Sequence, residues 1–155
     1  MQKKMLYLVQ HGEAKSKEED PERSLTEKGR RDVKKVAVWA AQTGLRIEQI
    51  RHSGKHRAAE TAEIFAKKLN LKKNVSAVSG IAPNDDVEPV ASILEQEGQS
   101  IMIVGHLPFL NRLASRLLVG NSERTVVRFR NGGLVGLSCD SGNWSVALLV
   151  PGDLN

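Results

Sequence analysis

The 155-residue sequence has few aromatic side chains, one cysteine and no long apolar run. Phe, Trp and Tyr make up 4% of it, which disfavours a nucleic-acid surface, because such surfaces stack bases on aromatic rings. Cys139 has no partner for an internal disulfide, so we expect a reducing, cytoplasmic location. The apolar run Met5–Val9 is too short for a signal-peptide core or a membrane span. We therefore expect a cytoplasmic protein that binds neither nucleic acid nor membrane.

Positive charge, in contrast, is in excess: 23 Lys and Arg stand against 18 Asp and Glu, a formal net charge of +5. This excess favours an anionic partner without saying which anion. With the cluster Lys67, Lys68, Lys72 and Lys73 it leaves a basic nucleic-acid binder open as a less favoured interpretation, although the cluster is most simply a solvated helix end. No repeat or linker divides the chain, so we assign residues 1–155 to a single domain.

Apolar patterns predict strands that alternate with helices. Predicted strands at 5–9, 47–50, 75–78 and 101–104 each precede a predicted helix, the first of which begins after Thr26 as N-cap and ends at Gly44. Residues 125–150 are typical of three short strands joined by Asn-Gly-Gly and Asp-Ser-Gly-Asn turns. This order predicts an α/β fold with three layers, α/β/α, and a mostly parallel central sheet that ends in antiparallel strands.

Polar residues follow each predicted parallel strand, at the edge of the sheet where ligands bind in such folds. In chain order they are Gln10, His11 and Gly12; His52, Ser53 and Arg57; Pro83, Asp85 and Asp86; and Gly105 and His106. Two histidines, an arginine and two acids are therefore expected to converge on one rim.

These residue types suit phosphoryl transfer. A histidine attacks phosphorus when one ring nitrogen is free and the other is held by a hydrogen bond. The phosphoryl group is anionic, so an arginine fork and a second histidine stabilise it, and a carboxylic acid protonates the leaving group. His11, Arg57, His106 and an acid form such a set, and Gly12 could bring its backbone N–H close to the anion. Taken singly, His106 could also be a helix cap and Arg57 a surface residue.

Metal and nucleotide chemistry lack a matching pattern. His52 and His56 are four residues apart, but no HExxH motif or cysteine ligand accompanies them, which favours surface histidines. A cysteine phosphatase loop at Cys139 needs an arginine six positions later, where Ser145 stands. There is no Gly-rich loop ending in Lys-Ser/Thr. We therefore expect neither a metal nor a cofactor.

Four segments occur in order over most of the chain: LYLVQHGEA, RSLTEKG, SGKHRAAETAEIFA and IVGHLPFLNRLA. They resemble the strand with Arg-His-Gly, the Arg-Pro-Leu-Thr-x-x-Gly segment, the Ser-Pro-x-x-Arg-Ala-x-x-Thr-Ala segment and the Gly-His-x-Pro segment of the histidine phosphatase superfamily. That family has the phosphoglycerate-mutase-like fold. Within it, the chain resembles the small SixA-type phosphohistidine phosphatases.

The resemblance implies roles for individual residues. His11 would be the nucleophile that is transiently phosphorylated, Arg57 would bind the phosphoryl group and His106 would hydrogen-bond it. The segment IAPNDDVEPV resembles the region before the last parallel strand in the small members. It makes Asp86 or Asp85 the candidate acid. Glu13, next to the phosphate-binding residues, is a further candidate.

Two positions depart from the family pattern. Gly54 stands in place of a usual proline, which should matter little. Gln10 stands in place of the arginine that forks onto the phosphoryl oxygens, and Gln offers two N–H donors but no charge. Losing one charged contact to the transition state costs about 10²–10³ in rate. Arg23, on a loop expected to be mobile, is the candidate for compensation.

These residues predict a metal-independent phosphatase with a covalent phosphohistidine intermediate on His11. The expected substrate is phosphohistidine in a protein, because so short a chain lacks long insertions that could form a lid. Two alternatives stay open: a phosphatase for a small phosphate ester, and a weak or inactive module that binds phosphate or a phosphoprotein. The sequence does not determine the oligomeric state.

Overall fold

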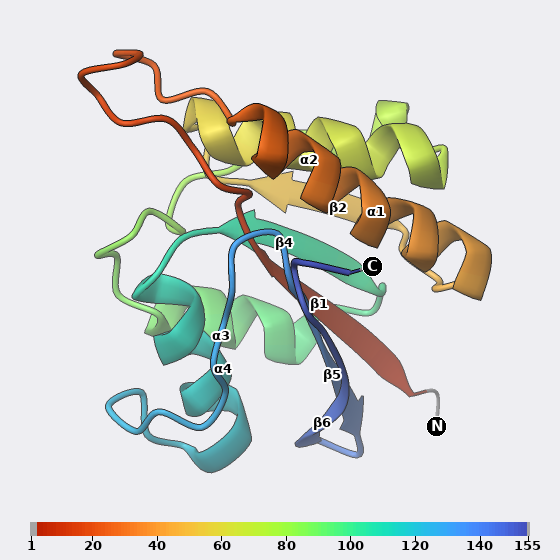
Figure 1. The fold of residues 1–155 in the computed structure, drawn as a ribbon. Helices are drawn as coiled ribbons and strands as arrows, with labels where there is room; N and C mark the ends of the chain where they lie inside the picture. The colour runs from red at the N-terminus through yellow and green to blue at the C-terminus, as the bar shows by residue number, and fades with distance from the viewer. Residues whose placement is uncertain (1–2, 155) are drawn as a thin grey trace.

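A six-stranded sheet forms the middle layer of the computed structural model, which describes residues 3–154 (Figure 1). The strand order is β3-β2-β4-β1-β5-β6. Strands β1 (Lys4–Gln10), β2 (Gln49–His52), β3 (Val75–Ala77) and β4 (Ile101–Gly105) are parallel to one another. β5 (Leu134–Asp140) and β6 (Asn143–Val150) are antiparallel. The predicted mostly parallel sheet with antiparallel C-terminal strands is confirmed.

Helices cover both faces of this sheet (Figure 1). α1 (Glu27–Thr43) and α2 (His56–Leu69) lie on one face, and α3 (Glu88–Gln96) and α4 (Phe109–Val119) lie on the other. Because side chains alternate along a strand, β1 sends Tyr7 and Val9 into the core under α1 and α2, and Leu6 and Leu8 into the core against α3 and α4. None of the helices within residues 3–154 combines the length and the apolar character that crossing a membrane requires.

Local signals explain where α1 begins and ends. Thr26 Oγ1 accepts the Gly29 N–H at 2.9 Å, so Thr26 is the predicted N-cap. Gly44 adopts the left-handed conformation with φ 76° and donates to the last carbonyls of the helix. The helix therefore follows the boundaries expected from the sequence.

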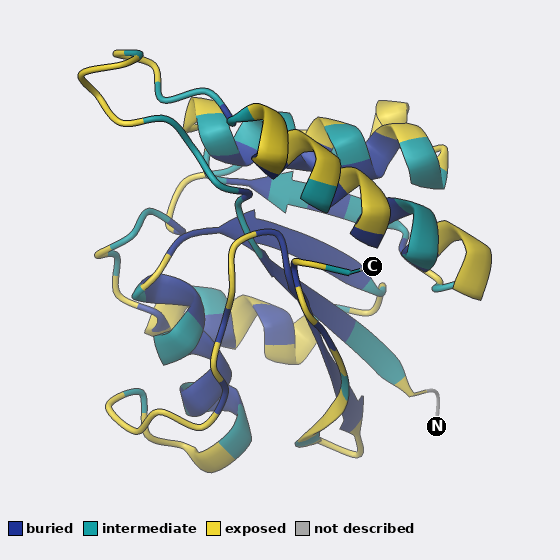
Figure 2. Cartoon of the chain, viewed as in Figure 1, coloured by how far each residue is buried: buried dark blue, intermediate teal, exposed yellow. Residues whose placement is uncertain are grey.

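Residues 125–130, predicted to be a strand, are irregular in the structure. Val127 and Phe129 are buried in the core against α3 and α4, so the apolar alternation is genuine. Figure 2 shows buried and exposed stretches alternating along this segment. β1 is already paired with β4 on one side and with β5 on the other, so it offers the segment no free edge. The segment instead runs to a turn at Asn131, beside the end of β1.

Candidate active site

His11 follows the end of β1, and its ring is held by the next residue. Its Nδ1 lies 2.7 Å from the carbonyl oxygen of Gly12. Because a carbonyl only accepts hydrogen bonds, Nδ1 carries the proton and Nε2 keeps a free lone pair. Burial is the main cause that lowers the pKa of His11 below its usual 6.5; the charges of Arg57 and Arg23 add to it, and the Gly12 hydrogen bond opposes it. The ring is therefore neutral and nucleophilic at pH 7.

His106 follows β4 and lies beside His11, with 5.1 Å between the ring centroids. It is only 2% exposed, and its Nε2 lies 2.6 Å from Ser53 Oγ. Ser53 Oγ accepts the Lys55 N–H at 3.3 Å, and its own hydroxyl can donate to Nε2; in that arrangement the proton of a neutral His106 ring lies on Nδ1. Burial first, and then the positive charges around the site, lower the pKa of His106 to about 3. This ring is neutral too.

Two arginines bring positive charge to the histidines. Arg57 lies in the first turn of α2, and Arg23 lies on the loop between β1 and α1. The charge of each lowers the pKa of both histidines, and Arg23, after burial, also lowers the pKa of Arg57. Arg23 therefore lies close enough for its charge to act on the two histidines, as expected of the compensating charge that the sequence predicted.

Arg23 is held in place by hydrogen bonds of its own loop, which was expected to be mobile. Its φ is 54°, a left-handed conformation that is uncommon for a residue with a side chain. Its Nε donates to the Lys15 carbonyl at 3.0 Å. Asp20 accepts hydrogen bonds from the Ser24 hydroxyl, the Ser24 N–H and the Glu22 N–H, and these, the hydroxyl first, lower the pKa of Asp20 to about 2.

Several buried polar atoms at these strand ends have no hydrogen-bond partner. Within residues 3–154 five buried side-chain nitrogen or oxygen atoms lack one, and three of them are Gln10 Oε1, Arg57 Nε and His106 Nδ1. Nearly all buried polar groups in folded proteins are paired, so this concentration marks a place where a polar ligand binds. Two of the three are ring or guanidinium nitrogens, which suits an anion.

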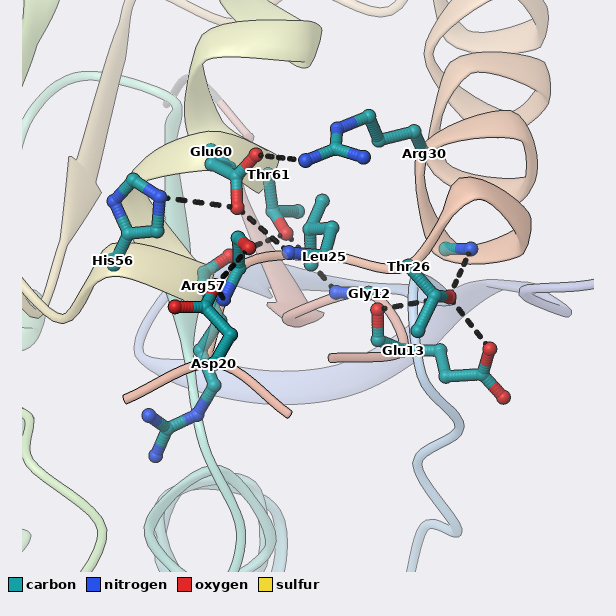
Figure 3. Close-up of polar contacts among 12 residues, drawn as sticks. Gly12, Glu13, Asp20, Leu25, Thr26, Arg30, His56, Arg57, Glu60 and Thr61 are labelled. Carbon is teal, nitrogen blue, oxygen red and sulfur yellow. Dashed lines mark hydrogen bonds and ion pairs between the residues drawn. The ribbon is translucent and has the colours of Figure 1, made fainter. Parts of the chain in front are cut away.

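One turn of α2 connects these parts (Figure 3). The buried Thr61 donates its hydroxyl to the Arg57 carbonyl at 2.8 Å and accepts the Gly12 N–H at 3.0 Å. Glu60, one residue earlier, accepts the Leu25 N–H at 2.7 Å and so fixes the end of the loop that carries Arg23. The turn that presents Arg57 therefore also orients Gly12, whose carbonyl orients His11.

Two further residues of the predicted site, Gly12 and Glu13, have other partners. The Gly12 N–H is taken by Thr61, so it does not face an anion, and a Cβ at this position would lie 2.7 Å from Val33 Cγ2. Glycine is needed here for packing. Glu13 accepts the Thr26 hydroxyl at 2.6 Å, at the start of α1 (Figure 3). The interpretation of Gly12 as an amide donor to phosphate is therefore wrong, and Glu13 is bound to the helix start.

The two candidate acids are engaged with backbone amides. Asp85 accepts the Ala82 N–H at 2.8 Å, and Asp86 accepts the Glu88 N–H at 3.0 Å. Within residues 3–154 no carboxylate hydrogen-bonds or ion-pairs with either histidine of the site or with Arg57. The structure therefore does not bring a proton donor into contact with the histidine pair, and the role of Asp85 or Asp86 stays a prediction.

Sequence reasoning gave no role to three residues that shape the site. Thr61 and Ser53 lie within a segment whose resemblance to the family was noted, and Thr61 is one helical turn after Arg57, so the helix period could have identified it. Asn131 carried no such signal. Its Oδ1 accepts the Gln10 Nε2–H at 2.7 Å across a separation of 121 residues.

Comparison with known proteins bears on this geometry. Residues 6–78 match the family model of the histidine phosphatase superfamily (branch 1). The solved structure of the protein histidine phosphatase SixA complexed with tungstate is 26% identical, with a TM-score of 0.85 over 96% of this chain and 97% of that chain. In sequence over residues 6–78 and in fold over nearly its whole length, the chain is similar to the histidine phosphatase superfamily. Its fold is the phosphoglycerate-mutase-like fold that the resemblance implied.

Two further solved structures share the fold of this chain. SixA from Agrobacterium tumefaciens is 23% identical, with a TM-score of 0.77 over 95% of this chain and 97% of that chain. A mycobacterial glucosyl-3-phosphoglycerate phosphatase in complex with VO3 is 14% identical, with a TM-score of 0.75 over 96% of this chain and 99% of that chain. No curated protein matches the chain.

The Thr61 hydroxyl gives a first testable prediction. Thr61→Val removes the acceptor of the Gly12 N–H at nearly constant volume, so we expect kcat for an aryl phosphate to fall about tenfold or more, because His11 is less well oriented. Thr61→Ser keeps the hydroxyl and should stay near the wild-type rate. Both variants are compared by steady-state kinetics, with thermal unfolding as the control for folding. An unchanged kcat in Thr61→Val, or an equal loss in Thr61→Ser, would contradict this role.

Proposed function

We propose that this protein is a metal-independent phosphatase that acts on phosphohistidine in a protein through a covalent intermediate on His11. The observation that carries the proposal is the free Nε2 lone pair of His11, next to a neutral His106 and an unpartnered Arg57 Nε. A nucleophile and donors for an anion thus lie together at the carboxyl ends of neighbouring strands. The lone, buried Cys139 supports a cytoplasmic location.

In the first step, His11 Nε2 attacks phosphorus as the bond from phosphorus to the leaving nitrogen breaks. The phosphoryl oxygens accept hydrogen bonds from Arg57 and from His106 Nδ1, and the charge of Arg23 stabilises them further. In the second step, water attacks phosphorus, and the electron pair of the P–N bond returns to Nε2. Inorganic phosphate leaves, and the His11 ring is neutral again.

The surroundings of the leaving group favour phosphohistidine over an alkyl ester. A phosphohistidine ring that is protonated on its other nitrogen leaves as neutral imidazole, which needs no further proton. An alkoxide is far more basic and needs an acid beside it. Within residues 3–154 no carboxylate contacts the histidine pair, since Asp85 and Asp86 are bound to backbone amides. This arrangement supports a nitrogen leaving group.

A reaction without metal fits the side chains present. In the described part of the chain, no three His, Cys, Asp or Glu side chains are grouped as metal ligands. His52 Nδ1 accepts the Gly54 N–H, and His56 pairs with Glu60, so these two histidines do not converge on one ion. Charge stabilisation would come from Arg57 and Arg23 instead.

A second candidate function is a module that binds phosphate or a phosphoprotein with little or no turnover. Gln10 favours this candidate, because an amide in place of a guanidinium supplies no charge to the transition state. The two functions share one site and differ in rate, so turnover separates them.

The nucleophile is tested with purified protein and an aryl phosphate. We expect His11→Ala to abolish turnover with an unchanged thermal unfolding midpoint, whereas His56→Ala, a histidine outside the site, keeps most of the activity. Wild-type activity should survive excess chelator. Substantial activity in His11→Ala would rule out the covalent mechanism, and activity lost to chelator but restored by zinc or magnesium would rule out metal independence.

Position 10 supplies the next prediction. Gln10→Arg restores a charged donor, so kcat/KM should rise about tenfold, the effect of roughly 1.4 kcal/mol in the transition state. Arg23→Ala should reduce kcat/KM more in the wild type than in Gln10→Arg, because the variant no longer depends on the substitute charge. The four proteins form a double-mutant cycle measured by steady-state kinetics. A lower or unchanged kcat/KM in Gln10→Arg would mean that Gln10 is adapted to its site.

A further inference from the structure

Asn131 is anchored directly beside Gln10 and His11. The N–H of the next residue, Gly132, donates to the Gln10 carbonyl at 2.8 Å and to the His11 carbonyl at 3.2 Å. Gly132 has a φ of 73°, and a Cβ there would lie 3.2 Å from Val33 Cγ2, so the backbone at this turn has little room to shift. The Asn131 side chain is exposed and contacts Gln10 from this fixed position.

The contact with Asn131 occupies the donor end of the Gln10 amide, so only its acceptor end remains for an anion. An amide has one donor end and one acceptor end. Asn131 Oδ1 takes the donor end, Nε2, and the acceptor end, Oε1, is buried without a donor. Gln10 pairs in register with Gly105, the residue before His106, so its side chain belongs to the same strand ends as the histidine pair. A phosphoryl oxygen is itself an acceptor, and a carbonyl oxygen beside it would repel it.

We propose that Asn131 is a positioning residue that sets which end of the Gln10 amide meets the phosphoryl group. Asn131 is exposed and has both a donor and an acceptor, so its amide reverses without disturbing buried packing. When both amides rotate by half a turn, Asn131 Nδ2 donates to Gln10 Oε1. Gln10 Nε2 then becomes free to donate to a phosphoryl oxygen. The two ends of an amide are nearly equal in size, so the paired reversal changes hydrogen bonding and not shape.

The inference rests on the proposed function only in that a phosphoryl group or a similar oxyanion binds at the site. It explains how an uncharged residue can serve at position 10. Every nitrogen of an arginine is a donor, so an arginine needs no partner to choose its orientation. A glutamine needs one. Asn131 therefore matters because residue 10 is Gln.

Asn131→Asp separates positioning from a merely structural tether. A carboxylate still accepts the Gln10 Nε2–H, so a structural tether and the thermal unfolding midpoint are preserved. It cannot donate to Oε1, so it holds the Gln10 carbonyl toward the site. Asp also adds a negative charge near an anion site, and this effect is isolated by making the same change in a Gln10→Leu background, where no amide is present to orient.

The probe is tungstate, and its affinity is measured by titration calorimetry for five proteins: the wild type, Asn131→Asp, Gln10→Leu, the variant with both changes, and Asn131→Leu. We expect Asn131→Asp to weaken tungstate binding about tenfold or more in the wild-type background and by a clearly smaller factor in the Gln10→Leu background. Asn131→Leu, which releases the Gln10 amide and adds no charge, should weaken binding much less than Asn131→Asp.

Three results would overturn the role of Asn131: unchanged affinity in Asn131→Asp, an equal loss in both backgrounds, or no binding of tungstate by the wild type. Turnover of an aryl phosphate is followed separately. If no variant hydrolyses it while the tungstate pattern holds, the proposed phosphatase function fails and the positioning role stands. If hydrolysis proceeds while Asn131→Asp binds tungstate normally, the positioning role fails and the proposed phosphatase function stands.

Discussion

The hydrogen bond between His11 Nδ1 and the Gly12 carbonyl determines which ring nitrogen can react, and much of the surrounding structure serves to hold Gly12 still. Its N–H is fixed by Thr61, whose hydroxyl is in turn fixed by the carbonyl of Arg57. Its Cα packs against Val33 so closely that no side chain fits. Helix α2 thus sets, through adjacent residues, the position of Arg57 and the orientation of His11, which are the phosphate-binding arginine and the nucleophile of the proposed mechanism. A shift of α2 relative to β1 would therefore disturb the position of Arg57 and the orientation of His11 together.

The positive charges at the site lower the pKa of both histidines. Burial and the nearby arginines lower the pKa of His11 and of His106, so both rings are uncharged at neutral pH. For His11, this means that the free Nε2 lone pair is present at lower pH than in an ordinary histidine, whose pKa is 6.5. In the proposed mechanism the same arginines attract the phosphoryl anion. Arg57 and Arg23 would then act twice, by adding to the effect of burial on the pKa of His11 and by stabilising the anion.

The sequence was informative where local chemistry decides structure. The cap at Thr26, the glycine at the end of α1 and the buried strands followed from spacing and residue type, and the convergence of Gln10, Arg57 and His106 followed from the rule for parallel sheets. Residues 125–130 could not be predicted in this way, because their apolar alternation is that of a strand, whereas Val127 and Phe129 are buried in an irregular segment. The same holds for the contact between Gln10 and Asn131, which arises from tertiary packing. The partner of the Gly12 amide, Thr61, was missed because the sequence of a glycine after a strand is the same whether its N–H faces an anion or a helix.

A phosphate bound covalently to His11 is the central claim, and it can be observed directly. The protein is mixed with phosphoramidate, quenched within milliseconds to seconds at alkaline pH, digested and examined by mass spectrometry. The account predicts one phosphate on the peptide that contains His11, stable to alkali, lost in acid and absent from His11→Ala. Turnover without phosphate on His11, or with phosphate on another residue, would contradict it.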